Sequence, residues 1–272
     1  MDRTTGRPKR SLGQHFLADE RVAARIVAAL EIGAEDLVLE IGPGRCALTG
    51  LLAAAGPARL CAVEKDDALA AALAAELALR YPGIEVSAGD ALEYPWQTLP
   101  AGAKIVGNLP YNVSARLVWA VASRAAAFKR AVFMVQHEMA LRLLAPPGHG
   151  AYGWLAVLVQ NVARVRRLFT VRPGAFRPRP KVDSAVVELV PLADRPADPA
   201  PLERLARACF ARRRKQLRSI LGPAWSVRLG EWLAGQGLAP NARPEELDQR
   251  RFLDLTHWLP ADFFDPNREF PY

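Results

Sequence analysis

The sequence has few of the residues that form disulfides or bind structural metals. Its 272 residues include three cysteines and four histidines. Cys46, Cys61 and Cys209 form no paired motif, so we expect small core residues and a reducing compartment. The pair His137-Glu138 is followed by Leu141, where a zinc-protease helix would have its second histidine. The sequence therefore predicts no disulfide framework and no metal site.

Long apolar runs are also missing. No run is long enough to span a bilayer, and the segment Ser11–Leu17 does not form the apolar core of a signal peptide. Hydrophobic residues make up 51% of the chain, which is typical of a soluble globular protein. We expect a cytoplasmic protein with no membrane partner.

Acidic residues are outnumbered by basic ones. The chain has 36 Lys and Arg against 28 Asp and Glu, a net charge of +8, which favours an anionic partner such as nucleic acid. The basic residues gather in two clusters whose charge suits contact with phosphates. The first contains Arg164, Arg166, Arg167, Arg172, Arg177, Arg179 and Lys181, and the second Arg212, Arg213, Arg214, Lys215 and Arg218.

Apolar runs alternate with helical stretches in the first two thirds of the chain. Near-continuous apolar strands separated by helices indicate a mostly parallel sheet covered on both faces, an α/β fold of Rossmann-like type. The predicted strands are Val38–Gly42, Arg59–Glu64, Ile84–Asp90, Lys104–Pro110 and Lys129–Gln136, and the predicted helices include Asp66–Tyr81, Val113–Ala125 and Tyr152–Ala163.

The last third changes in character. Two further strands, Val165–Val171 and Ala185–Pro191, have no helix between them and should pair antiparallel at the sheet edge. A proline-rich linker, Pro191–Pro201, follows. Three helices are predicted beyond it, at Leu202–Leu221, Val227–Gln236 and Pro244–Leu259. We therefore predict a catalytic domain over residues 1–192 and a small all-helical domain over residues 193–272.

A glycine loop follows the first predicted strand. Gly42, Gly44 and Ala47 fit the pattern G-x-G-x-x-A, and Glu64 ends the next strand at the spacing of a ribose-binding acid. Asp90 ends the third strand, where its carboxylate could accept a hydrogen bond from an adenine amino group. The loop alone does not distinguish a dinucleotide from S-adenosylmethionine (SAM).

The tetrapeptide Asn108-Leu109-Pro110-Tyr111 ends the fourth strand. Ligands of open α/β sheets bind at this end of the strands. The Asn108 side-chain carbonyl and the Leu109 backbone carbonyl can accept the two N–H groups of an exocyclic amine, and Tyr111 can stack on its ring. This set suits group transfer to the amino nitrogen of adenine.

These motifs together resemble the ribosomal RNA adenine N6,N6-dimethyltransferases of the bacterial small-subunit type. The resemblance covers nearly the whole chain. It is carried by Gly13-Gln14-His15-Phe16-Leu17, Glu40-Ile41-Gly42-Pro43-Gly44, Val63-Glu64, Gly89-Asp90-Ala91, Asn108-Leu109-Pro110-Tyr111-Asn112, Gln136-His137-Glu138, Tyr152-Gly153 and the long segment Pro173–Ser184. Ala115-Arg116 stands where many relatives have Thr-Pro, and His137 where Lys or Arg is frequent.

The resemblance implies a SAM-dependent methyltransferase that dimethylates N6 of adjacent adenines near the 3′ end of 16S rRNA. It implies 16S rRNA in the immature 30S subunit as the partner. From the basic clusters we expect the helical domain to bind rRNA, and nothing in the sequence requires more than a monomer. The cofactor-binding residues that it implies are His15, Leu17, Gly42, Glu64, Asp90 and Asn108. The substrate-site residues are Asn108, Leu109, Tyr111 and Phe176, with Phe176 on a surface loop as the second stacking face.

Other functions are compatible with parts of the sequence. The 23S rRNA dimethyltransferases of the resistance type and a mitochondrial transcription factor share the ancestry, and a ribosome-assembly factor could bind pre-rRNA without catalysis. Gly42, Gly44 and Glu64 would also suit a nicotinamide oxidoreductase, but that function gives no reason for the tetrapeptide at Asn108. The segment Pro173–Ser184 favours the small-subunit enzyme.

Overall fold

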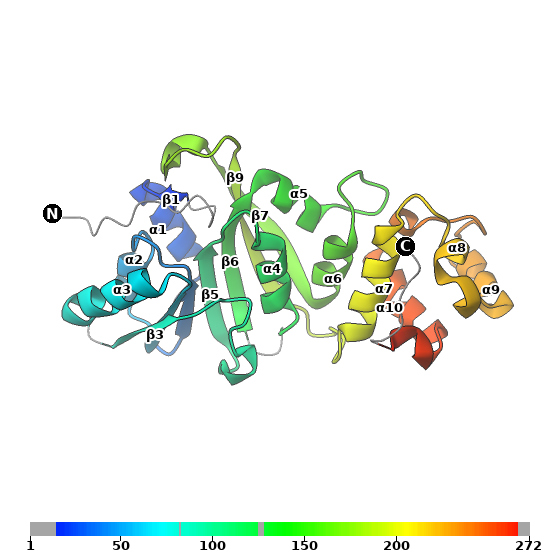
Figure 1. Ribbon diagram of the computed structural model, residues 1–272, viewed down its shortest axis with the longest axis horizontal. Helices are drawn as coiled ribbons and strands as arrows, with labels where there is room; N and C mark the ends of the chain where they lie inside the picture. Colours follow the sequence, from blue (N-terminus) through cyan, green and yellow to red (C-terminus); the bar gives the residue numbers. More distant parts are fainter. Residues whose placement is uncertain (1–14, 82, 125–127, 266–272) are drawn as a thin grey trace. The chain divides into compact units, whose positions relative to one another are not determined.

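The computed structural model describes residues 15–81, 83–124 and 128–265, and divides into two compact units (Figure 1). The first unit runs to Ala140 and includes Ala163–Leu192, and the second contains Leu141–Val162 and the chain from Ala193 onward. Residues 141–162 are thus grouped with the C-terminal helices, whereas the expected division placed them in the catalytic domain. Gly13, Gln14 and Ala125 of the predicted motifs and helix lie outside the described residues.

A seven-stranded sheet forms the centre of the described part of the first unit, with strand order β4-β3-β2-β5-β6-β9-β7. Strands β4, β3, β2, β5 and β6 are parallel, and β9 runs antiparallel to both β6 and β7. The strands are β2 (Leu37–Ile41), β3 (Arg59–Glu64), β4 (Ile84–Ala88), β5 (Ala103–Asn108), β6 (Phe128–Gln136), β7 (Ala163–Val171) and β9 (Ser184–Pro191). This confirms the predicted mostly parallel sheet with an antiparallel edge.

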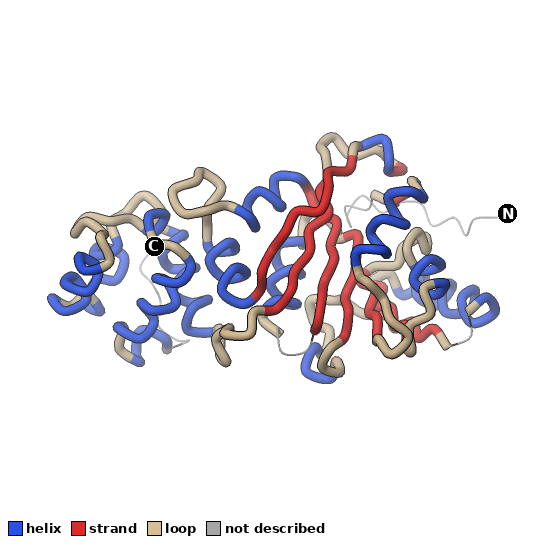
Figure 2. The backbone as a smooth tube through the Cα atoms, turned by 180° about the vertical axis from the view of Figure 1, so that it is seen from behind, coloured by secondary structure: helices blue, strands red, loops and turns tan. Residues whose placement is uncertain are grey.

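The central strands are apolar because helices cover both of their faces. Val38, Ile105 and Phe133 are almost completely buried. Helix α4 lies in front of the sheet in Figure 1, and α1 lies in front of it in Figure 2, which shows the reverse side. The helices that begin in this unit are α1 (Glu20–Ala29), α2 (Thr49–Ala54), α3 (Asp67–Arg80), α4 (Ser114–Ala122) and α5 (His137–Leu144).

Aspartates define where two of these helices begin. The Asp19 carboxylate accepts hydrogen bonds from the backbone N–H groups of Arg21 and Val22, and Asp66 accepts one from Leu69. Such caps satisfy N–H groups that have no partner within the helix. No helix in the described ranges is long and apolar enough to cross a membrane.

A second, two-stranded sheet was not predicted from the sequence. Strand β1 (Phe16–Leu17) pairs antiparallel with β8 (Phe176–Arg177), so that Leu17 lies opposite Phe176. The backbone N–H of Ala18 extends the pairing with a 2.8 Å hydrogen bond to the Ala175 carbonyl. The small sheet joins two sequence motifs that lie more than a hundred residues apart in the chain.

The second unit is helical. Its helices are α6 (Trp154–Val162), α7 (Ala200–Ala211), α8 (Leu217–Leu221), α9 (Val227–Gly235) and α10 (Gln249–Trp258). Helix α6 is buried on nearly all sides, which explains its grouping with α7 and α10. Asn161 on α6 donates a hydrogen bond to the Gln249 carbonyl at the start of α10. The hydroxyl of Tyr152 donates to the Leu247 carbonyl at 2.9 Å.

The predicted helix Leu202–Leu221 was wrong in its continuity. It divides into α7 and α8, and Arg212 leaves the helical conformation with φ −123° and ψ 37°. Four consecutive cations start at this point, and Arg212 and Lys215, three residues apart, would lie close together on a continued helix. Arg213 instead donates hydrogen bonds to the Gly150 and His149 carbonyls, which holds the turn.

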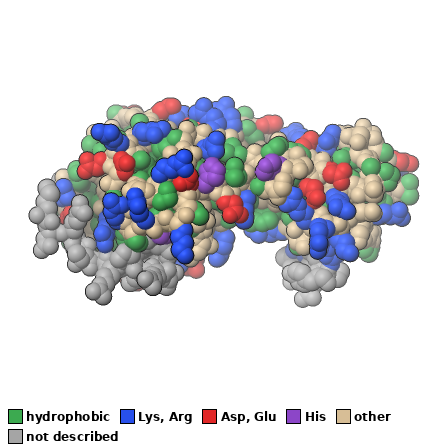
Figure 3. All heavy atoms as spheres, turned by 90° about the horizontal axis from the view of Figure 1, so that it is seen from above, with side chains coloured by type: hydrophobic (Ala, Val, Ile, Leu, Met, Phe, Trp, Pro, Cys, Tyr) green, Lys and Arg blue, Asp and Glu red, His purple; other side chains and the backbone are tan. Residues whose placement is uncertain are grey.

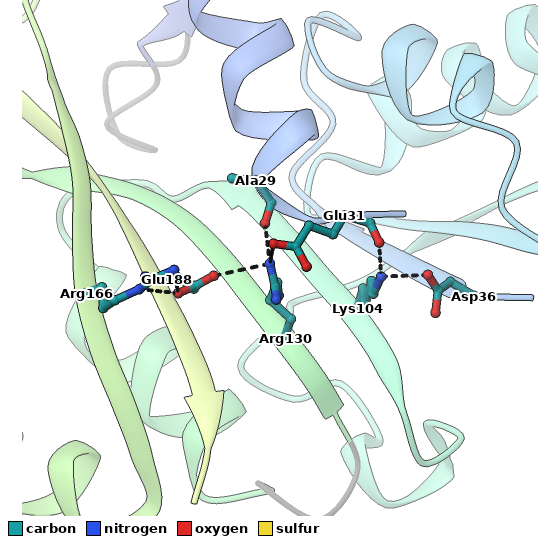
Figure 4. Close-up of polar contacts among 7 residues, drawn as sticks. All are labelled: Ala29, Glu31, Asp36, Lys104, Arg130, Arg166 and Glu188. Atoms are coloured by element: carbon teal, nitrogen blue, oxygen red, sulfur yellow. Dashed lines mark hydrogen bonds and ion pairs between the residues drawn. The ribbon is translucent and has the colours of Figure 1, made fainter. Parts of the chain in front are cut away.

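Charged side chains connect four neighbouring strands at the edge opposite the carboxyl ends of the parallel strands (Figure 4). Glu188 on β9 is buried. It accepts a hydrogen bond from Arg166 on β7 at 2.8 Å and forms an ion pair with Arg130 on β6 at 3.3 Å. Arg130 also pairs with Glu31 at 2.6 Å. On β5, the ammonium of buried Lys104 pairs with Asp36 at 2.6 Å, and this hydrogen bond lowers the pKa of Asp36.

We expect Glu188→Ala to lower the free energy of unfolding by about 2–4 kcal/mol, because it leaves Arg130 and Arg166 without their shared buried partner. Urea denaturation measures the change. The matched control is Glu85→Ala, which removes an exposed carboxylate paired with Arg59 on the same sheet and should change stability little. Equal effects of the two substitutions would contradict a structural role for the Glu188 network.

Candidate active site

The loop after β2 brings backbone close to a pocket at the carboxyl ends of the strands. Gly42 and Gly44 have φ values of 65° and 56°, a conformation that glycine adopts without steric cost. A Cβ on Gly44 would lie 3.2 Å from the Phe16 ring of β1. The N–H of Gly42 donates to the Val63 carbonyl at 2.9 Å, which holds the loop against β3.

Glu64 lies at the end of β3, on the floor of the same pocket. It is 4% exposed, and its two carboxylate oxygens accept backbone hydrogen bonds from Gly44 at 3.2 Å and from Asp66 at 3.1 Å. These bonds fix the plane of the carboxylate. The remaining lone pairs can accept the two hydroxyls of a ribose.

Asp90 follows β4 and lines the next part of the pocket. Its Oδ2 pairs with Lys65 at 2.6 Å, and its Oδ1 accepts from the Leu92 N–H at 2.9 Å. Burial raises the pKa of Asp90, but these hydrogen bonds outweigh it and leave the pKa below its ordinary value. Asp90 is therefore an ionised acceptor at neutral pH.

A second buried acid, Glu40, was not predicted as a site residue. It lines the pocket at the end of β2 and is 1% exposed. The hydroxyl of Thr49 donates to Glu40 at 2.7 Å. Burial raises the pKa of Glu40 to about 7, and the nearby Glu64 acts in the same direction. Burial also raises the pKa of the Cys46 thiol to about 11, so this cysteine supplies no thiolate beside the loop.

The tetrapeptide Asn108–Tyr111 forms the opposite wall of the pocket. Gly107 precedes it. A Cβ at this position would lie 2.8 Å from the Ile41 carbonyl, so only glycine allows β5 to lie this close to β2. Asn108 Nδ2 donates to the His15 carbonyl at 2.8 Å. Because a carbonyl can only accept, this bond turns Oδ1 away from His15 and leaves it as an acceptor for a ligand.

Leu109 and Tyr111 occupy the positions that the sequence predicts for them. The N–H of Leu109 donates to the Met134 carbonyl at 3.0 Å, which fixes the peptide next to Asn108. The hydroxyl of Tyr111 lies 2.7 Å from the hydroxyl of Ser184, the first residue of β9. Burial raises the pKa of Tyr111, so its phenol is neutral.

One pocket therefore contains eight of the nine residues predicted for the cofactor and substrate sites. They are His15, Leu17, Gly42, Glu64, Asp90, Asn108, Leu109 and Tyr111. Four of the five stretches of sequence that meet here lie at the ends of parallel strands, which share one edge of the sheet. The fifth, His15–Leu17, is placed by the pairing of β1 with β8.

Phe176 does not lie in this pocket, and the prediction that it is on a surface loop was wrong. Its side chain has 0% exposure and packs in a core cluster with Leu17, Ala23 and Ile26. The pairing of β8 with β1 turns this ring inward. In this conformation Phe176 has no accessible face for a base.

Two contacts at this site were not expected from the sequence. Ser184 orients the Tyr111 hydroxyl, and the Pro178 carbonyl lies 2.9 Å from Nδ1 of His15. Ser184 and Pro178 both belong to the long segment Pro173–Ser184. The sequence motif linked this segment to the family but did not indicate which wall of the pocket it contacts. Among the described residues, no group of three or more His, Cys, Asp or Glu side chains is arranged to hold a metal ion.

A Rossmann-like sheet with a glycine loop, a ribose-type acid and an amide beside an aromatic ring defines a nucleoside-binding transferase of the SAM-dependent methyltransferase class. The profile of the ribosomal RNA adenine dimethylase family matches residues 6–260. The chain belongs to this family and is an rRNA-modifying methyltransferase.

Similar proteins agree with this assignment. Ribosomal RNA small subunit methyltransferase A of Nitratidesulfovibrio vulgaris strain Hildenborough is 47% identical over 254 residues, which cover 92% of this chain and 95% of that protein. The protein of the same name from Pseudomonas aeruginosa PAO1 is 41% identical over 259 residues, covering 93% and 95%.

Two solved structures are also similar. The dimethyladenosine transferase of Plasmodium falciparum superposes with a TM-score of 0.71 at 27% identity, over 89% of this chain and 96% of that one. The 23S rRNA methyltransferase ErmE superposes with a TM-score of 0.68 at 27% identity, over 90% and 99%.

The buried Glu40 predicts a pH-dependent stability. Its folded pKa of about 7 exceeds the ordinary glutamate value of 4.5, so the contribution of Glu40 to stability should fall as pH rises from about 4.5 through 7. Glu40→Gln keeps an acceptor for Thr49 and removes the ionisation. We compare the free energy of unfolding of Glu40→Gln with that of the wild type at each pH. This difference should favour the variant by up to about 3 kcal/mol more at pH 8 than at pH 4.5.

Urea denaturation at several pH values measures this difference. The control is Glu35→Gln, an exposed glutamate just before the same strand, which should leave the pH dependence unchanged. Parallel stability profiles for wild type and Glu40→Gln would contradict a raised pKa for Glu40.

Proposed function

We propose that the protein transfers methyl groups from SAM to N6 of adjacent adenines near the 3′ end of 16S rRNA in the immature small subunit, two to each base. The observation that carries the proposal is the orientation of the Asn108 amide. Its Nδ2 is bound to the His15 carbonyl, so Oδ1 is the end available to a substrate amine. The small-subunit relatives at more than 40% identity favour this target over 23S rRNA.

The pocket fits SAM by the chemistry of its groups. Glu64 offers carboxylate oxygens to ribose hydroxyls, and Asp90 offers one to an adenine amino group. Gly42, His15 just before β1, and Leu17 of β1 also line the pocket. When bound, SAM supplies an electrophilic methyl group.

The residues at the other wall orient the amine. The N6 lone pair of adenine is delocalised into the ring, so the amine is a poor nucleophile. Oδ1 of Asn108 and the carbonyl of Leu109 can accept its two N–H groups, which favours a pyramidal nitrogen with its lone pair directed at the methyl group. No strong general base lies in the motif, and the proton can leave to water after transfer. Catalysis then depends on positioning and electrostatics.

Incubation with labelled SAM and unmethylated 30S particles, followed by mapping of the modified bases, tests the proposal. We expect label on adjacent adenines near the 3′ end of 16S rRNA. Asn108→Ala should reduce the rate by roughly a hundredfold or more, because it removes one acceptor of the reacting amine. A parallel incubation uses large-subunit particles. Label on their 23S rRNA, with none on the 30S particles, would support the activity of the resistance type, for which the similarity to ErmE is the specific observation.

The same variant distinguishes catalysis from binding. A non-catalytic assembly factor would be unaffected by Asn108→Ala and would transfer no label. An assembly role could accompany catalysis in the same cytoplasmic, monomeric protein.

For the helical unit we propose rRNA binding through the turn between α7 and α8. Lys and Arg side chains are scattered over the face of the molecule shown in Figure 3. Arg214, Lys215 and Arg218 are exposed, and no carboxylate of the described residues pairs with them. Arg213 differs, because its guanidinium donates to the Gly150 and His149 carbonyls and lies 3.4 Å from Glu245.

We expect the triple variant Arg214→Ala, Lys215→Ala, Arg218→Ala to bind 30S particles more weakly. The slope of log K against log salt should also become shallower by about 0.7–0.9 for each phosphate that the variant no longer neutralises. Filter binding across salt concentrations measures both effects. Arg213→Ala is the matched control, and it should lower the melting temperature and leave the salt slope unchanged. A wild-type slope in the triple variant would reject this role for the turn.

A further inference from the structure

Lys65 follows Glu64 at the end of β3, and its side chain reaches across to Asp90 beyond β4. The ammonium donates to Oδ2 of Asp90 at 2.6 Å, and both residues line the pocket. The other carboxylate oxygen, Oδ1, accepts the Leu92 N–H at 2.9 Å. Because each oxygen has its own donor, the plane of the carboxylate is fixed, and lone pairs remain for a ligand.

The position of this ion pair matters more than its contribution to stability. The Lys65 side chain is 56% exposed, and ion pairs so accessible to water stabilise a fold little. A second pair joins the same two strands at the same distance, since Arg59 on β3 lies 2.6 Å from Glu85 on β4. Arg59 and Glu85 do not line the pocket that contains Lys65. The two pairs therefore differ in what lies beside them.

Several charges act on Asp90. Burial raises its pKa, whereas the hydrogen bonds from Lys65 and the Leu92 N–H and the charge of Arg116 on α4 lower it. Without Lys65, burial would be opposed less and the pKa of Asp90 should rise. The other charged side chains that line a pocket together with Asp90 are Glu40, Glu64, Glu85, Glu93, Arg45 and Arg59.

An ionised carboxylate in a fixed orientation distinguishes purines by the group at position 6. Adenine has an amino group there, whose N–H the carboxylate can accept. A 6-oxo purine has a carbonyl oxygen there, which cannot donate and which the carboxylate repels. A site built around such a hydrogen bond rejects the analogue that lacks the donor.

We propose that Lys65 is a positioning residue that holds Asp90 as the acceptor for the adenine amino group of the cofactor, and thereby sets the selectivity for a 6-amino purine. This inference rests on the proposed function. In this role Lys65 acts through Asp90 and makes no bond to the base.

The test measures Kd by calorimetry for S-adenosylhomocysteine (SAH) and for its 6-oxo analogue, S-inosylhomocysteine. SAH has no sulfonium, so the loss of a lysine charge does not strengthen its binding by removing repulsion. Lys65→Met removes the ammonium and keeps the length of the side chain, and Lys65→Arg keeps a cation. Arg59→Met is the matched control, because it breaks the equivalent pair on the same strands. The melting temperature of each variant is also measured.

We expect Lys65→Met to raise the Kd for SAH by roughly tenfold, because the acceptor is no longer held in place. The Kd for the 6-oxo analogue should change by less than about threefold, so the preference for SAH narrows. Lys65→Arg should retain most of the preference, and Arg59→Met should retain all of it. In an Asp90→Asn background, Lys65→Met should have little further effect, since the two residues act as one unit. The melting temperature should stay close to that of the wild type.

The pH dependence of SAH binding is a second readout. Protonation of Asp90 removes its negative charge and weakens its hydrogen bond to the amino group. As the pH is lowered from about 8, binding to Lys65→Met should therefore weaken at a higher pH than binding to the wild type. Lys65→Arg should follow the wild-type profile.

Four results would overturn the inference. The first is an unchanged Kd for SAH in Lys65→Met, and the second is an equal loss for SAH and the 6-oxo analogue, which would assign Lys65 to the general shape of the pocket. The third is a loss that persists in full in the Asp90→Asn background, and the fourth is a pH profile identical to that of the wild type. If the wild type binds neither SAM nor SAH, the proposed function fails first, which is distinguishable from all four.

Discussion

The hydrogen bond from Asn108 Nδ2 to the His15 carbonyl is the contact on which the site depends. It joins residues 93 positions apart and links the end of β5 to the residue just before β1. Without it the Asn108 amide could rotate and present its N–H₂ group to the substrate amine, which would repel another donor. One backbone carbonyl therefore determines the polarity of the wall that faces the reacting nitrogen.

The bond lies next to the boundary between β2 and β5, where the two halves of the seven-stranded sheet meet. The chain builds β2, β3 and β4 outward in one direction and then returns to place β5 on the other side of β2. A crevice opens where the strand order reverses, and ligands of such sheets bind there. Gly107 brings β5 against the Ile41 carbonyl at this point, so the glycine loop and Asn108 lie on the two sides of one narrow crevice.

The sequence predicted the parts of the site that depend on strand ends. Glu64 and Asn108 end apolar strands and Asp90 lies just beyond β4, and parallel strands bring their ends together. It did not predict the two-stranded sheet, because strands as short as Phe16–Leu17 show no periodicity. Phe176 is buried because β8 pairs with β1. Since the sequence did not predict this pairing, it wrongly placed Phe176 on the surface. The break at Arg212 was missed because apolar residues resume at Leu217, after five polar residues that contain no glycine or proline. The carbonyls that bind Arg213 lie elsewhere in the chain.

Charge in the first unit also separates the two cofactors that the glycine loop left open. The pocket is lined by three carboxyl groups, those of Glu40, Glu64 and Asp90. Of its cationic side chains, Lys65 is already paired with Asp90, and Arg45 lies over the Phe16 ring. A dinucleotide would bring a pyrophosphate, whose negative charges the carboxylates repel. SAM has no phosphate and carries a positive sulfonium, so the same carboxylates attract it. The charge of the pocket thus fits the proposed SAM, whereas exposed cations such as Arg214 and Arg218 fit the proposed contact with RNA phosphates.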